Sequence, residues 1–179
     1  MIQKSIYVIT GGPGFGKSAL IDALEKKGFH CGKDVAREFI KEQISNGGKI
    51  FPWSNRIEFS KIILQKRIKQ YENALKGKIC FFDRGIPDII GFFIKDELEV
   101  PQEFFKAERD YKYKKIVFLT PPWLEIYKKD NVRRMDYNEA VVIHNILKKL
   151  YQELGYEIIN IPKVQVSERV KFILSKIKE

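Results

Sequence analysis

Short runs of apolar residues recur along the chain, and amphipathic or polar stretches separate them. Apolar runs of this length that end in a glycine, a proline or an acid are typical of buried strands. The run around residues 29–32 is the weakest of them. We interpret five runs as strands: Ser5–Thr10, Phe29–Gly32, Ile79–Asp83, Ile116–Thr120 and Tyr156–Ile161.

The stretches between these runs carry apolar residues at helical spacing. The pattern predicts helices over 16–27 and 34–45, an irregular helical stretch over 86–110 that is interrupted before Pro101, and a periodic helix that ends at Gly155. Two further helices are expected to be capped by Ser54 and Ser167. The helix after Ser54 has a predicted buried face made of Ile57, Leu64, Ile68, Tyr71 and Leu75.

Strands that alternate with helices predict a parallel sheet that is covered on both faces, and therefore the α/β class. Ligands of such sheets bind beyond the carboxyl ends of the strands. The distinctive polar residues of this chain follow the predicted strands at those ends. The sequence therefore predicts one ligand site that several strand ends share.

A complete phosphate-binding pattern, Gly-x-x-x-x-Gly-Lys-Ser, follows the first predicted strand and opens the first predicted helix. Glycines let the backbone turn its N–H groups toward a phosphate, and the helix N-terminus adds partial positive charge. Lys17 is expected to reach the β- and γ-phosphates of ATP or GTP, and Ser18 to bind Mg²⁺. The predicted nucleotide-binding residues are Gly11, Gly12, Pro13, Gly14, Phe15, Gly16, Lys17, Ser18 and Ala19.

Asp83 ends the third predicted strand, and Arg84 follows it directly. An acid at this point can hold Mg²⁺ or accept a proton from an attacking hydroxyl, and an arginine beside it can bind a substrate. The alternative is that Asp83 only caps the turn that follows. We expect Asp83 to be a catalytic and metal-binding residue and Arg84 to bind substrate.

A polar, basic segment at 128–136 lies between the fourth strand and the periodic helix. Arginines in such a segment can stabilise the charge that develops during phosphoryl transfer, and the segment could close as a lid that expels water. The alternative is an ordinary solvated loop. Arg133 and Arg134 are both predicted catalytic residues, and the sequence does not distinguish them.

Asp34, Arg37 and Glu38 follow the second predicted strand and open a helix. Asp34 or Glu38 could bind a substrate hydroxyl, and Arg37 lies beside them. An ordinary surface ion pair at helical spacing is an equally good reading. We retain all three as candidate substrate-binding residues.

The formal net charge of +10 over 179 residues indicates affinity for anions but does not choose between phosphates, nucleic acid and acidic lipid. Cys31 and Cys80 lack metal-site spacing, and His30 and His144 are interpreted as packing residues. No apolar run approaches the ~20 residues of a membrane helix. A cytoplasmic, single-domain protein over 1–179 is expected.

The ordered set GGPGFGKS, DVAREFI, FFDRGIPD, KKDNVRRMD and LYQELGYEIINIP resembles the AAA-domain group of small P-loop ATPases, which is related to the ribosylnicotinamide kinase domain of bacterial NAD-salvage proteins. The resemblance spans almost the whole chain. It implies a three-layer α/β/α kinase-type fold with strand order 2-3-1-4-5. In similar folds the turn at Pro162, after the last strand, lies against the nucleobase; the alternative is a plain surface turn.

The resemblance implies a base among Asp34, Glu38 and Asp83, and a lid arginine at Arg133 or Arg134. The ribosylnicotinamide kinase pattern has Asp-Thr-Asp after strand three, whereas this chain has Asp-Arg-Gly at 83–85. A different acceptor pocket is therefore expected.

The resulting hypothesis is a small-molecule phosphotransferase that uses Mg²⁺ and ATP or GTP on a nucleoside- or nucleotide-like hydroxyl acceptor. The main alternative is a nucleotide-dependent switch with an anionic-lipid or protein partner, which the basic charge would favour. Specific nucleic-acid binding is not expected, because no nucleic-acid motif is present.

Overall fold

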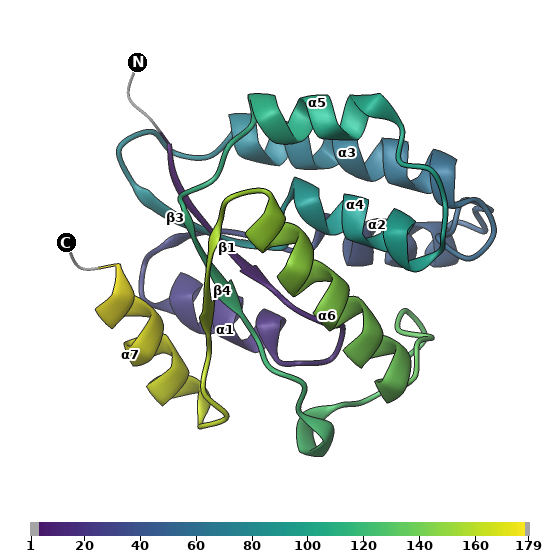
Figure 1. Ribbon diagram of the computed structural model, residues 1–179. Helices are drawn as coiled ribbons and strands as arrows, with labels where there is room; N and C mark the ends of the chain where they lie inside the picture. Colours follow the sequence, from purple (N-terminus) through teal and green to yellow (C-terminus); the bar gives the residue numbers. More distant parts are fainter. Residues whose placement is uncertain (1–3, 178–179) are drawn as a thin grey trace.

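The computed structural model describes residues 4–177, and its strands form one parallel sheet (Figure 1). The strand order is β2-β3-β1-β4-β5, as the family resemblance implied. The fold-class prediction is therefore confirmed. The strands are β1 (Ser5–Thr10), β2 (His30–Gly32), β3 (Ile79–Asp83), β4 (Ile116–Leu119) and β5 (Glu157–Asn160).

Helices cover both faces of this sheet, so the molecule has three layers (Figure 1). The helices are α1 (Lys17–Lys26), α2 (Val35–Ser45), α3 (Arg56–Glu72), α4 (Ile86–Lys95), α5 (Gln102–Asp110), α6 (Tyr137–Glu153) and α7 (Val166–Lys176), with a short 3-10 helix η1 (Leu124–Ile126). The irregular stretch at 86–110 thus divides into α4 and α5, and Pro101 caps α5.

Alternation along β1 shows how the two faces are buried. Tyr7 and Ile9 pack with α1 and α7, whereas Ile6 and Val8 pack with the helices of the opposite face. Both sets are almost completely buried, as strands of a doubly covered parallel sheet must be. Among the described residues, no helix combines the length and apolar character that crossing a bilayer requires.

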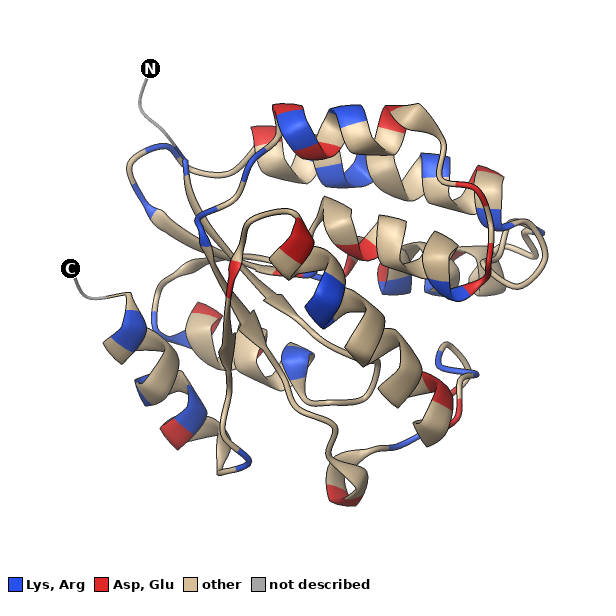
Figure 2. Ribbon diagram, viewed as in Figure 1, with Lys and Arg blue, Asp and Glu red and all other residues tan. Residues whose placement is uncertain are grey.

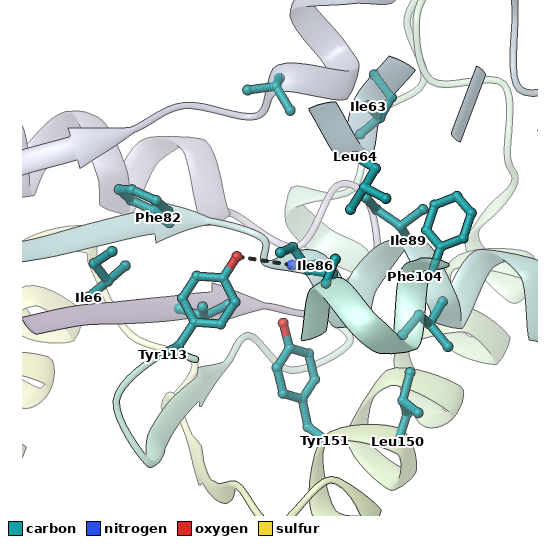
Figure 3. Close-up of a cluster of buried hydrophobic side chains, with 14 of the residues drawn as sticks. Ile6, Ile63, Leu64, Phe82, Ile86, Ile89, Phe104, Tyr113, Leu150 and Tyr151 are labelled. Atoms are coloured by element: carbon teal, nitrogen blue, oxygen red, sulfur yellow. Dashed lines mark hydrogen bonds between the residues drawn. The ribbon is translucent and has the colours of Figure 1, made fainter. Parts of the chain in front are cut away.

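Two tyrosines of the larger core cluster, Tyr113 and Tyr151, lie at the turn after β3 (Figure 3). The hydroxyl of Tyr113 accepts a hydrogen bond from the Ile86 amide at 3.1 Å, at the first residue of α4. Tyr151, from α6, lies beside it in the same cluster and points toward the same turn (Figure 3). The segment that carries Asp83 and Arg84 is therefore held by the core.

Two predicted helix starts are wrong. Asn55, not Ser54, caps α3, because its side chain accepts a hydrogen bond from the Glu58 amide at 3.1 Å. Ser54 instead accepts a bond from the Phe51 amide within the preceding turn. The last helix begins at Val166, so Ser167 lies inside its first turn.

The predicted buried face of α3 is only partly correct. Leu64 is buried, but Ile57 is 48% exposed and Leu75, which lies beyond the helix, is 50% exposed. Ile68 and Tyr71 pack against the core as expected, and the buried face also includes the polar residues Ser60 and Arg67. Arg67 is buried because its guanidinium hydrogen-bonds to the backbone at the end of β3.

Candidate active site

The phosphate-binding loop connects β1 to α1 and requires glycine at several positions. Gly11, Gly14 and Gly16 have φ of 132°, 83° and 84°, which other residues rarely adopt. A Cβ atom at Gly14 would lie 2.6 Å from the Tyr127 ring. The loop therefore has the backbone freedom and close packing that a phosphate cradle needs.

Lys17 is buried at the start of α1. Its ammonium donates hydrogen bonds to the carbonyl oxygens of Gly11 and Gly12, at 3.0 and 2.7 Å. Burial, followed by the nearby Arg84 guanidinium, lowers the pKa of Lys17 to about 7. Because a triphosphate would supply the missing anionic partner, this lysine suits a site that receives one.

Phe15 lies in the loop, but its side chain belongs to the core. The side chain is completely buried, and its ring meets Tyr137 and His144 edge-on, at centroid distances of 5.8 and 6.1 Å. Phe15 can therefore contact a nucleotide through its backbone only. His144 is buried as well, and burial lowers its pKa to about 4, in agreement with the packing role expected from the sequence.

Asp83 reaches the loop from the end of β3, the strand next to β1. Its Oδ2 atom accepts a hydrogen bond from the Ser18 hydroxyl at 3.3 Å. Its Oδ1 atom is buried and has no hydrogen-bond partner among residues 4–177. Burial, and then the neighbouring Asp34 carboxylate, raise the pKa of Asp83 to about 6.

The pairing of Ser18 with Asp83 suits a magnesium ion. Both supply oxygen, which Mg²⁺ prefers, and one carboxylate oxygen lacks a partner. The described residues contain no group of three or more His, Cys, Asp or Glu that could hold a metal. Mg²⁺ usually keeps several waters in its shell, so Ser18 and Asp83 would supply only part of its coordination.

Arg84 adopts the left-handed conformation, with φ of 72°, and its side chain turns into the protein. Its Nε atom lies 3.3 Å from Asp34, and its Nη1 atom donates to the Gly11 carbonyl and to Asp88, at 3.0 and 3.1 Å. The guanidinium thus connects the phosphate loop to two carboxylates. A strained arginine held in this way is typical of a functional site.

Asp34 caps α2 and also faces two buried arginines. Its Oδ1 atom accepts the Ala36 amide at 3.1 Å and lies 3.4 Å from Arg67. Burial alone would raise the pKa of Asp34, but Arg84 and Arg67 outweigh it, so the pKa is lowered. Glu38 is exposed and lines a smaller adjoining cavity of about 160 Å³.

Two functional positions were missed by sequence reasoning. Arg67 donates to the carbonyl oxygens of Asp83 and Arg84, at 2.7 and 3.1 Å, and so fixes the backbone that carries both side chains. Asp88 accepts hydrogen bonds from Thr10, Arg84 and Tyr151. The sequence did offer a signal for Asp88, because an acid four residues after Arg84 can pair with it on one face of a helix. For Arg67 the sequence shows only a cation within a predicted helix.

The structure separates the two arginines of the 128–136 segment. Arg133 lies against the phosphate loop: a Cβ atom at Gly14 would be 3.5 Å from its Nε atom. Arg134 packs on an aromatic ring, with its guanidinium carbon 3.8 Å from the centre of the Trp53 ring. Arg133 therefore contacts the phosphate loop, whereas Arg134 contacts Trp53, and both line the cavity described below.

One cavity of about 780 Å³ joins these groups. It extends from the phosphate loop past Asp83 into a space between α2, α3 and α4. The predicted residues Pro13, Ala19, Asp34, Arg37 and Arg84 line it, whereas Pro162 lies outside its lining. The far part has an apolar wall made of Ile40, Phe59, Ile63, Ile89 and Phe92.

The family model described as an AAA domain matches residues 6–169, which is most of the chain. The chain belongs to this AAA-domain family. The family prediction is therefore confirmed over nearly its full extent. A search of curated proteins finds no match.

Solved structures of kinases share the fold at low sequence identity. Deoxyadenosine kinase from M. mycoides has a TM-score of 0.65 and 15% identity, with coverage of 96% of this chain and 97% of that one. Thymidylate kinase from Ehrlichia chaffeensis has a TM-score of 0.66 and 10% identity, with coverage of 98% of this chain and 99% of that one. NadR in complex with NAD and AMP-PNP gives 0.71 and 13%, with coverage of 98% of this chain and 51% of that one.

Lys and Arg positions are spread over most of the helices, with acidic positions among them (Figure 2). The anionic-lipid or protein partner that the net charge suggested gains no support from these comparisons.

Proposed function

We propose that this chain transfers the γ-phosphoryl group of ATP or GTP to a hydroxyl of a nucleoside- or nucleotide-like acceptor. Residues 1–179 form one kinase-like domain in this proposal, and the segment 128–136, called the lid from here on, closes over the donor. The observation that carries the proposal is Asp83. It pairs a buried, unpartnered oxygen with a raised pKa, beside the phosphate loop and at the mouth of a large cavity.

The donor triphosphate binds in the loop from Gly11 to Ala19. Its amides and the N-terminus of α1 neutralise the phosphates, and Lys17 contributes a full charge. Arg133, which already lies against Gly14, stabilises the charge that grows on the transferred group. Ser18 and Asp83 would hold Mg²⁺, which supplies further neutralisation of the phosphates when bound.

The acceptor occupies the far part of the cavity. Its apolar wall suits a flat ring, and the charged edge near Arg56 and Asp96, whose Nε and Oδ2 atoms are 2.6 Å apart, suits polar groups on that ring. Arg84 and Asp34 lie between this space and the phosphate loop, so they can orient the reacting hydroxyl. Arg37 and Glu38 lie nearer the surface and are weaker candidates for acceptor contacts.

In the transfer step, the acceptor oxygen forms a bond to the γ-phosphorus while the bond from that phosphorus to the bridging oxygen breaks. The nucleoside diphosphate leaves, and the hydroxyl proton passes to a carboxylate. Asp83 lies beside the phosphate loop and lines the cavity, and it is one candidate in a state where it does not hold Mg²⁺, because a bound cation would keep its carboxylate ionised. Asp34, whose pKa is lowered, is the other candidate within the cavity.

The test is ADP or GDP release measured over a panel of nucleosides and nucleotides, with ATP or GTP as donor. We expect release that depends on one class of acceptor and that is lost in Lys17→Ala. Asp83→Asn and Asp34→Asn are compared at saturating acceptor and Mg²⁺, and the base is the residue whose replacement removes the acidic limb of the pH profile of kcat. Absence of acceptor-dependent release across the panel would contradict the proposal.

A further inference from the structure

Two of the contacts between the lid and the rest of the protein are made with residues that lie far away in the sequence. Asp130 pairs with Arg37 of α2, with Oδ2 and Nη2 2.5 Å apart. Arg134 stacks on Trp53, which lies in the connection between α2 and α3. Both partners line the cavity, so the lid is attached on the acceptor side.

The same carboxylate also shapes the lid from within. Its Oδ1 atom accepts hydrogen bonds from the amides of Val132 and Arg133, at 2.9 and 2.8 Å. An aspartate that binds amides two and three residues ahead imposes a tight turn on its own backbone. The turn fixes the peptide from which the Arg133 side chain extends toward Gly14.

Asp130 is therefore engaged on two sides at once. Burial alone would raise its pKa, but the hydrogen bonds from Arg37 and from the two amides outweigh this and lower the pKa to about 2. The carboxylate is consequently ionised throughout the physiological range, and both attachments persist there.

We propose that Asp130 is a positioning residue: through Arg37 it anchors the lid to α2, and through its turn it places Arg133 at the phosphate loop. In this proposal Asp130 acts through Arg37 and Arg133 and not on the transferred group. The kinetic consequence rests on the proposed phosphotransferase activity, whereas the anchoring of the lid does not depend on it.

Limited trypsin digestion tests the anchor without any activity. The lid contains the trypsin sites Lys128, Lys129, Arg133 and Arg134. Arg37→Gln breaks the ion pair and leaves the lid sequence unchanged, so any change in cleavage reports opening of the lid. An exposed ion pair stabilises the closed lid only slightly, so we expect its loss to raise the rate of lid cleavage about two- to fivefold.

The matched control is Lys106→Gln, which removes an exposed pair with Asp110 on α5. We expect lid cleavage at the wild-type rate in this variant, with fragments mapped by mass spectrometry. If Arg37→Gln is also cleaved at the wild-type rate, the anchor is absent and the inference is overturned.

Two substitutions at Asp130 then separate its two attachments. Asp130→Asn keeps an oxygen that can accept the amides of Val132 and Arg133 but loses the charge toward Arg37. Asp130→Ala loses both. We expect kcat for transfer to fall in the order wild type, Asn, Ala, and the share of the γ-phosphoryl group lost to water to rise in that order, with little change in the KM for ATP.

A residue that only maintained the fold would lower the amount of active protein but leave the partition between acceptor and water unchanged. Equal partition and equal kcat in wild type and Asp130→Ala would overturn the positioning role. If the wild-type protein shows no acceptor-dependent transfer, the proposed function fails, and the trypsin experiment still decides the anchor.

Discussion

The end of β3 and the lid both carry charge, but they hold it in opposite ways. At the end of β3, Lys17, Arg67 and Arg84 face Asp34, Asp83 and Asp88, and most of these side chains are buried. In the lid, the side chain of Asp130 is 38% exposed, and that of its partner Arg37 is 29% exposed. Arg134 packs on the exposed ring of Trp53.

This contrast indicates which part of the site is preformed. Rearranging a buried set of opposite charges costs much free energy, because removal of one member leaves another charge without a partner in a medium of low polarity. Exposed pairs contribute little and exchange readily with water. Substitutions near β3 should therefore change stability and activity together, whereas substitutions in the lid should change activity alone.

The largest expected effect separates the two lid arginines. Arg133→Ala should lower the rate of transfer by a factor on the order of 10³, because a cis-acting arginine stabilises the transferred group. Arg134→Ala should lower it by less than about fivefold, since it loses only a contact with an exposed aromatic ring. Single-turnover kinetics measure both, and equal effects would remove the distinction that the structure makes.

Asp34→Ala should destabilise the fold strongly. It leaves Arg67 and Arg84 with one partner fewer, and loss of one member of a buried pair costs about 3–5 kcal/mol in the free energy of unfolding. Glu38→Ala, four residues along on the exposed face of the same helix, should stay within about 0.5 kcal/mol of wild type. Urea denaturation compares the two, and a mild effect of Asp34→Ala would show that the cluster is not preformed.

Nucleotide affinity should fall as the pH rises above neutrality. The pKa of Lys17 is lowered from 10.5 to about 7 in the free protein, so above pH 7 the lysine is largely neutral and must take up a proton to bind a triphosphate. The dissociation constant should therefore rise by up to about tenfold per pH unit between pH 7 and 9. Calorimetric titrations measure it, with Lys17→Ala as the control that should bind weakly with a flat profile.

Asp83→Asn should show a stabilisation that depends on pH. Because the pKa of Asp83 is raised from 3.8 to about 6, its contribution to stability is present below pH 4 and is lost as the pH rises through 6. The variant should therefore gain stability relative to wild type between pH 4 and pH 7.5. Thermal unfolding across this range is the measurement, and a difference that does not change with pH would mean that Asp83 titrates normally.

The sequence predicted the part of the site that local patterns encode. The phosphate loop is contiguous, and the rule that ligands bind at the carboxyl ends of parallel strands brought Asp83 and Arg84 to it. Arg67 was not predictable, because its role depends on the rotation of α3 about its own axis. That rotation was misjudged when Ile57 and Leu75 were assigned to the buried face, although both are exposed.

Arg133 and Arg134 could not be separated in advance for a related reason. Adjacent residues in an irregular segment point in directions that the local turn decides, and here the turn is made by Asp130. Its partner Arg37 lies in α2, 93 residues earlier in the sequence. Long-range pairs of this kind leave no periodic signal in a single sequence.

Transfer of the γ-phosphoryl group to an acceptor is tested most directly by following the label of [γ-³²P]ATP in the presence of an acceptor panel. Wild-type protein is predicted to deliver most of the label to an acceptor hydroxyl, and Asp83→Asn to deliver almost none. Label that appears only as inorganic phosphate, at a rate that no acceptor changes, would contradict the account.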